Sequence, residues 1–264
     1  MVLLSFLVVT GCSRRDILDD YPVSGVEVRL DWSGVTEKLP EGVRIIFYPK
    51  DEKGRKIDTY LSVTGGEVKV PSGHYAVVIY NYDTETVLIR GEESYETIQA
   101  YTNFCKLGIA GTEKMVWGPD PLYVVNIDDL DIQNSEETLI LKLKPKLVIR
   151  TYSFSIKVQG LSNVSNVIGS IGGMADHYFL GKAYAMCDDY PINIDLNVKA
   201  GKIEGVFTTF GLPEAIITRL EIKLPVMMNL MIIKVDNSVQ EVKINITEAV
   251  QEPTGGGEGG EGAV

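Results

Sequence analysis

The residue types that most side-chain chemistry requires are scarce in this chain. It has 264 residues but only two histidines, His74 and His177, and three cysteines. A catalytic triad or a histidine-rich metal site needs several such groups close together. Neither histidine lies near a serine or cysteine in a recognisable nucleophile motif. We therefore interpret both as surface or sheet-edge residues and expect no catalytic, cofactor-binding or metal-binding residue.

Two further motifs could hold a ligand, but simpler interpretations fit them better. Residues 126–131 (NIDDLD), with Glu136 and Glu137 after them, offer carboxylates for Ca²⁺ but lack the glycine and spacing of an EF-hand loop. Residues 169–173 (GSIGG) lack the Lys-Ser or Lys-Thr of a phosphate-binding loop. We expect a solvated acidic loop and a turn or bulge at a sheet edge. A catalytic pair of carboxylates from distant positions, as in glycoside hydrolases, stays an open alternative, although nothing in the sequence marks a particular pair.

The third cysteine, Cys12, ends an uncharged apolar run at the start of the chain. The run is too short for a membrane-spanning helix, which needs roughly 20 apolar residues. The segment Val9-Thr10-Gly11-Cys12 resembles the lipobox of bacterial lipoproteins. This resemblance implies that Val9, Thr10 and Gly11 are recognised by the signal peptidase and that Cys12 is acylated to become the first mature residue.

Two alternatives accompany this interpretation. No Lys or Arg precedes the run, as the basic region of a signal peptide would require, which is compatible with a true start further upstream. A buried first strand with an incidental cysteine is the other. Export would place Cys105 and Cys187 in an oxidising compartment as the one possible disulfide pair. Because they lie in different halves of the chain, we favour two isolated, buried thiols over a bridge.

The charge balance excludes polyanionic partners. With 36 acidic and 25 basic residues the formal charge is −11, so no attraction to nucleic acid is expected. A hydrophobic content of 45% is sufficient for one or two cores.

Most of the chain after the N-terminal segment shows the residue pattern of β-strands. In residues 26–32 apolar and charged residues alternate, which places Val26, Val28, Leu30 and Trp32 on one face. The same alternation recurs in residues 152–158. Between them, residues 92–107 have Tyr95 and Ile98 at helical spacing and predict one short helix or irregular crossover.

The domain organisation follows from where the alternation stops. Pro145 interrupts two strand-like runs, and a second set of strands begins after it. Short strands with regularly spaced turn signals predict an all-β chain with two β-sandwiches in tandem. The expected segments are a signal peptide (1–11), a tether (12–22), an N-terminal sandwich (23–144), a C-terminal sandwich (147–250) and a disordered Gly-rich tail (251–264).

Several stretches in order resemble the fimbrillin-like surface lipoproteins of Bacteroides-type bacteria, in particular their fimbrial anchor and minor-subunit group. The matching stretches include 43–49 (VRIIFYP), 80–85 (YNYDTE), 158–161 (VQGL), 173–175 (GMA) and 205–212 (GVFTTFGL). The resemblance implies two transthyretin-like (Greek-key) domains without catalytic residues. It also implies a lipid-anchored, surface-exposed protein of the outer membrane. Such a protein is an anchor, cap or accessory subunit of a pilus assembled by strand exchange.

In this resemblance the partners are pilin subunits, bound at a sheet edge by β-augmentation, with a role in cell adhesion. The Gly-rich tail departs from the pattern, because glycine offers a groove no side chain and makes a poor donor strand. The alternative function is a stand-alone surface lipoprotein that binds glycan or host protein. An exposed coplanar pair of aromatic rings would favour that alternative.

Overall fold

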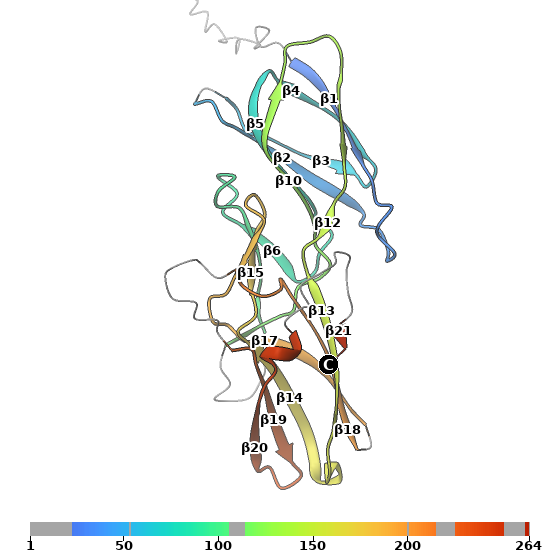
Figure 1. The fold of residues 1–264 in the computed structure, drawn as a ribbon, viewed down its shortest axis with the longest axis vertical. Coiled ribbons are helices and arrows are strands. Elements are labelled where there is room, and N and C mark those ends of the chain that lie inside the picture. Colours follow the sequence, from blue (N-terminus) through green and yellow to red (C-terminus); the bar gives the residue numbers. More distant parts are fainter. Residues whose placement is uncertain are drawn as a thin grey trace, which may run out of the picture.

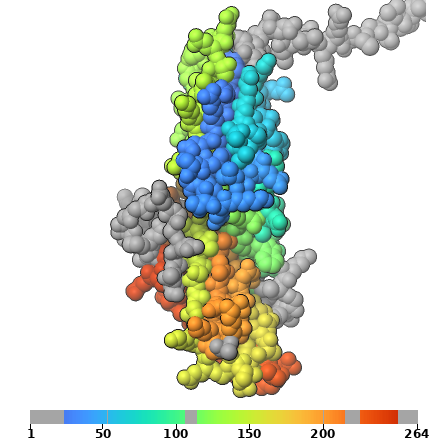
Figure 2. Space-filling model, turned by 90° about the vertical axis from the view of Figure 1, so that its right-hand side faces the viewer, coloured from blue at the N-terminus to red at the C-terminus, as the bar shows by residue number. Residues whose placement is uncertain are grey.

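The computed structural model describes residues 23–52, 54–105, 114–199, 201–214, 225–250 and 262–263. Nearly all of its regular structure is β-strand, which confirms the all-β prediction. Three sheets follow one another along an elongated molecule, with the N-terminal half at one end and the C-terminal half at the other (Figures 1 and 2). Among the described helices none is long and apolar enough to cross a membrane.

The first sheet has eight strands and comes from the N-terminal half. Its order is β11-β1-β4-β3-β2-β5-β10-β12. Neighbours are antiparallel except β1 and β11, which are parallel. The strands are β1 (Val23–Leu30), β2 (Gly42–Pro49), β3 (Ile57–Ser62), β4 (Gly65–Pro71), β5 (Gly73–Asn81), β10 (Tyr123–Ile132), β11 (Leu139–Leu143) and β12 (Lys146–Leu147).

This sheet curls, and the side chains on its inner face pack against one another to form a core. The prediction that Val26, Val28, Leu30 and Trp32 share a buried face is confirmed. Val26 and Val28 are core residues, and Leu30 and Trp32 pack against this core. The same core takes alternate residues of β2, β4 and β5. On the opposite face the buried residues of β2 and β5 are Ile46, Tyr48, Ala76, Val78 and Tyr80. Burial on both faces explains why β5 reads as a continuous apolar run in the sequence.

The second sheet comes mainly from the C-terminal half. Its order is β20-β19-β14-β17-β18-β13-β21, and β8 and β9 join it beside β17. Tyr152 and Phe154 of β13 face its core while Ser153 and Ser155 are exposed, as the alternation predicts. The strands are β8 (Phe104–Cys105), β9 (Met115–Val116), β13 (Arg150–Lys157), β14 (Val164–Gly172), β17 (Ile192–Lys199), β18 (Lys202–Thr209), β19 (Met227–Lys234), β20 (Val239–Asn245) and β21 (Gly262–Ala263).

A third, smaller sheet joins the two halves. Its order is β16-β15-β7-β6, so strands from 87–102 pair with strands from 177–186. Two short helices complete the described structure. The elements are β6 (Val87–Arg90), β7 (Gln99–Thr102), β15 (His177–Phe179), β16 (Tyr184–Met186), the 3₁₀ helix Leu161–Asn163 and α1 (Thr247–Val250).

A hydrophobic core shared by both halves lies around this middle sheet. Ile46 and Val78 contribute from the first sheet, Leu122 from the segment before β10, and Leu180 and Phe210 from the C-terminal half. The division at Pro145 therefore stays a prediction about folding units. Beyond it, β12 still pairs with β10 of the first sheet.

Two local predictions were wrong, and in a third the helical alternative fails. Residues 92–105 contain no helix: Ser94 O accepts from Thr97 N and Ile98 N to form one turn, and the chain then enters β7. The acidic segment 126–131 is not a loop but lies in β10, with a register irregularity between Ile127 and Leu130. Residues 169–172 lie in β14, which is an interior strand with β17 and β19 on its two sides.

The tail is described at two residues. Gly262 and Ala263 pair in parallel with Tyr152 and Ser153 of β13, although the tail as a whole is predicted to be disordered. The other tail residues, 251–261 and 264, lie outside the described residues.

Candidate functional site

The predicted lipidation site lies outside the described residues. Cys12 and the recognition residues Val9, Thr10 and Gly11 all fall within 1–22. Acylation therefore stays a prediction.

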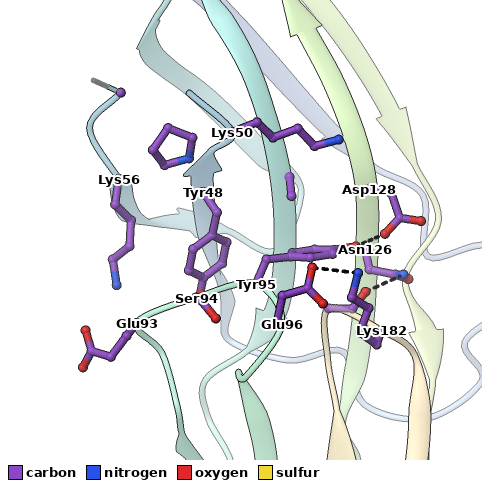
Figure 3. Close-up of a pocket in the computed structure, with 14 residues that line it drawn as sticks. Tyr48, Lys50, Lys56, Glu93, Ser94, Tyr95, Glu96, Asn126, Asp128 and Lys182 are labelled. Carbon is purple, nitrogen blue, oxygen red and sulfur yellow. Dashed lines mark hydrogen bonds and ion pairs between the residues drawn. The ribbon is translucent and has the colours of Figure 1, made fainter. Parts of the chain in front are cut away.

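One pocket of about 660 Å³ opens where the two halves meet (Figure 3). Tyr48 and Lys50 reach it from the end of β2, Asn126 and Asp128 from β10, and Lys182 from the turn between β15 and β16. The other residues labelled in Figure 3 are Lys56 and residues 93–96 of the following turn. The C-terminal half contributes one wall of the pocket, through Gly181 and Lys182.

Several polar side chains of this pocket interact with one another. The Tyr95 hydroxyl donates to Asp128 Oδ1 at 2.8 Å, and Lys182 Nζ lies 2.8 Å from Glu96 Oε1 (Figure 3). Lys182 Nζ also lies 5.2 Å from the centre of the Tyr95 ring. Burial, assisted by Asp128, raises the pKa of the Tyr95 hydroxyl. Because Tyr48 and Tyr95 are both buried, neither ring offers an open face for stacking on a sugar.

Two pairs of exposed aromatic residues, within the part of the chain that the structure describes, also lack the geometry of a flat platform. Tyr60 and Tyr82 are 61% and 44% exposed, and their ring centres are 5.2 Å apart. The angle between the rings is 88°, an edge-to-face arrangement. Phe104 and Tyr190 meet in the same way, at 84°. Neither pair is the coplanar pair that would favour glycan binding.

Arg44 lies on the same face of β2 as Ile46 and is the centre of a hydrogen-bond network there. Its guanidinium donates to both oxygens of Asp58 at 2.9 and 2.7 Å and to both oxygens of Glu92 at 2.7 and 2.9 Å. It also donates to the Tyr80 hydroxyl at 2.8 Å. The hydrogen bond from Arg44 holds the pKa of Asp58 below its ordinary value. This network ties β2 and β3 to the segment that leads into the middle sheet.

We expect Arg44→Ala to lower the free energy of unfolding by about 2 kcal/mol, because two partly shielded carboxylates lose their donor. Arg44→Lys, which keeps the charge but not the paired geometry, should recover only part of the loss. Urea unfolding at pH 7 measures both. Since the folded-state pKa of Asp58 is depressed, its contribution is present above the ordinary value of 3.8 and is lost as the pH falls below it. An Arg44→Ala defect that persists unchanged at pH 3 would contradict this origin.

The open sheet edges are the remaining candidates for contact with another chain. Within the described residues β20 pairs with β19 alone, and β11 pairs with β1 alone. Lys142 lies on β11, and Lys144 and Lys146 follow it, an arrangement that discourages strand addition. The β20 edge is longer, with Val242 and Ile244 packed inward against the second core.

The backbone alternation of β20 shows which amides face outward. Lys234 N donates to Ser238 O at 2.8 Å, and the pairing register keeps this pattern along the hairpin. The amides of Gln240, Val242 and Ile244 therefore face β19. Those of Glu241 and Lys243 point away from it, toward the open edge.

Comparison with known proteins places this architecture in a family. The model of a domain of unknown function, DUF5119, matches residues 11–195, which is more than half of the chain. The chain belongs to the DUF5119 family. A Bacteroides ovatus protein, Fim4B, named for a proposed role as a fimbrium anchoring subunit, is 51% identical over 273 residues, covering 99% of this chain and 82% of that protein.

Solved structures agree with the fold of this DUF5119 member. A crystal structure of a candidate adhesin from Bacteroides ovatus has 52% sequence identity and a TM-score of 0.81, covering 92% of this chain and 89% of that one. The fimbrial anchor protein Mfa2 from Porphyromonas gingivalis gives a TM-score of 0.54 at 14% identity, covering 86% and 82%. The second likeness concerns the fold only. The transthyretin-like topology stays an implication of the sequence resemblance.

One histidine and one cysteine of the DUF5119 chain differ in burial from the prediction. His74 is half-exposed beside Asp129 and Asp131, as expected of a surface residue. His177 is buried, which corrects its interpretation as a surface or edge residue: β15 has β16 on one side and β7 on the other. Cys105 and Cys187 are free, as favoured, but Cys187 is only half-buried.

Proposed function

We propose that this protein is an anchoring or accessory subunit of a fimbrium. The observation that carries the proposal is the 51% identity, over nearly the whole chain, to a protein named as a fimbrium anchoring subunit. An elongated all-β body with open sheet edges suits a subunit that is held at one end and joined to others. In this proposal the role is structural and not catalytic.

We propose further that acylated Cys12 holds the chain to the outer membrane, with the β-sheets exposed on the cell surface. The lipobox-like sequence supports this, and a tether of about ten residues would separate the lipid from β1. Acylation with more than one chain is required for stable attachment, because a single acyl chain binds a bilayer only marginally.

The contact with pilin subunits is assigned to the β20 edge by β-augmentation. An added strand needs outward-facing amides and carbonyls, and β20 offers them over seven residues. The Lys-bearing β11 edge is the less suitable alternative. The pairing needs no special side-chain chemistry, which agrees with the few chemically reactive residues in the chain.

We expect Lys243→Pro to weaken binding of the co-encoded pilin subunit about tenfold, because proline removes an outward amide donor and leaves the β19 ladder intact. Lys243→Ala is the matched control: it loses the same side chain but keeps the amide. Surface plasmon resonance with purified pilin measures both, and circular dichroism checks the fold. Equal binding by Lys243→Pro and Lys243→Ala would move the contact to another edge.

A further inference from the structure

A cluster of three metal-ligating side chains lies at the junction of the halves, away from the β20 edge. Asp176 and His177 precede and begin β15, and Asp188 follows β16. The three are the one group of metal-ligating residues found among the described residues. Their ligand atoms all lie within 4.8 Å of one another. Nothing in the proposed fimbrial role uses this cluster.

The geometry of the cluster is close to that of a coordination site. His177 Nδ1 lies 2.6 Å from Asp176 Oδ1 and 3.9 Å from Asp188 Oδ2. Ligand atoms around a tetrahedral ion with bonds of about 2.0–2.1 Å are separated by roughly 3.3 Å. The two observed distances bracket that value, so ion binding requires the first pair to separate by about 0.7 Å and the second pair to approach by about 0.6 Å.

Two of the three ligands are held in place before any ion binds. The side chains of Asp176 and His177 are each 5% exposed. Asp176 Oδ2 accepts from the backbone amides of Asp188 at 2.9 Å and Tyr190 at 3.3 Å, which fixes the loop that carries the third ligand. The side chain of Asp188 is 53% exposed, so an ion can enter from the solvent side.

The local electrostatic field is negative. Asp176, Asp188 and Asp189 all lie near the Cys187 thiol, so three carboxylates are gathered at this point. The positive group facing the cluster is Arg90, whose Nη2 lies 3.9 Å from Asp188 Oδ2. Three carboxylates against one guanidinium leave a surplus that favours a cation.

We propose that Asp176, His177 and Asp188 bind a divalent transition-metal ion, with Zn²⁺ as the best-matched ion. One imidazole nitrogen and two carboxylate oxygens suit this class, and water completes the coordination. On binding, Nδ1 gives its proton to solvent and donates its lone pair to the ion, so the direct Asp176–His177 hydrogen bond is replaced by two bonds to the metal. The ion would fasten the 187–190 loop to the middle sheet that joins the halves.

The test measures Zn²⁺ binding by the full-length protein in detergent, with Cys187→Ser in every sample to remove thiol binding. Asp188→Asn deletes a charged ligand on an exposed side chain, so the fold is retained. Asp189→Asn is the matched control: it removes the neighbouring charge without removing a ligand, and asparagine tolerates the left-handed backbone at that position, φ 65°.

We expect one equivalent of Zn²⁺ by isothermal titration, affinity at least about tenfold weaker in Asp188→Asn, and a much smaller loss in Asp189→Asn, which removes a nearby charge but no ligand. Zn²⁺ should also raise the unfolding temperature of the Asp189→Asn protein more than that of Asp188→Asn. No Zn²⁺-dependent heat, or equal loss in both variants, would overturn the site. Pilin binding by the same variants is a separate readout, so failure here leaves the fimbrial proposal untouched.

Discussion

Replacing Leu180 with alanine is expected to lower the free energy of unfolding of the whole molecule by about 2–5 kcal/mol, the range for a large-to-small change at a fully buried site. Leu180 has no exposed surface and lies in the core shared by both halves. Its amide also donates to Ile98 O at 3.0 Å, which ties the C-terminal half to the segment entering β7. The cavity would therefore weaken the contact between halves as well as the C-terminal half itself.

Leu212→Ala is the matched control, since it removes the same atoms from a side chain that is 40% exposed. It should cost well under half as much. Urea unfolding followed by tryptophan fluorescence reports on both halves, because Trp32 packs against the first core and Trp117 lies beside β9. A single transition shifted by Leu180→Ala is the expected result. Two separate transitions, with only one shifted, would show that the halves fold independently.

The fold class follows from the sequence because strand alternation is a local property. Val26 to Trp32 and Tyr152 to Val158 each show which face is buried, and the structure agrees in both cases. Pairing between distant strands leaves no such local trace. Nothing in residues 99–102 indicates that they pair with 177–179, so the middle sheet and its shared core are missing from the sequence interpretation.

The helical alternative for 92–107 fails over the described residues 92–105 for a physical reason. Tyr95 and Ile98 are spaced for one helical turn, and one turn does form around Ser94. The following residues gain more by pairing with β6 and β15 than by extending the turn, so tertiary contacts override the local periodicity. The prediction for His177 fails for a related reason. Its strand, β15, is only three residues long, and so short an interior strand leaves no alternation in the sequence that would indicate burial.

Replacing Cys12 with alanine is expected to release the protein from the outer membrane or to leave an uncleaved precursor. The sulfur of Cys12 is the atom that would carry the lipid, and the lipobox-like segment contains no other thiol. Because stable attachment requires more than one acyl chain, loss of Cys12 should remove essentially all membrane retention and not a fraction of it. Fractionation of cells, with labelled palmitate as the reporter, measures both attachment and acylation.

Cys187→Ala provides the control for a cysteine change elsewhere in the chain. Cys187 is half-buried and free in the folded body, and burial raises the pKa of its thiol to about 11, so it is a poor nucleophile for acylation. The Cys187→Ala protein should stay with the membrane and incorporate palmitate as the unaltered chain does. If the Cys12→Ala protein incorporates the label equally, the lipid lies elsewhere. The fimbrial proposal would then have to rest on the identity to Fim4B and the open β20 edge without a lipid at Cys12.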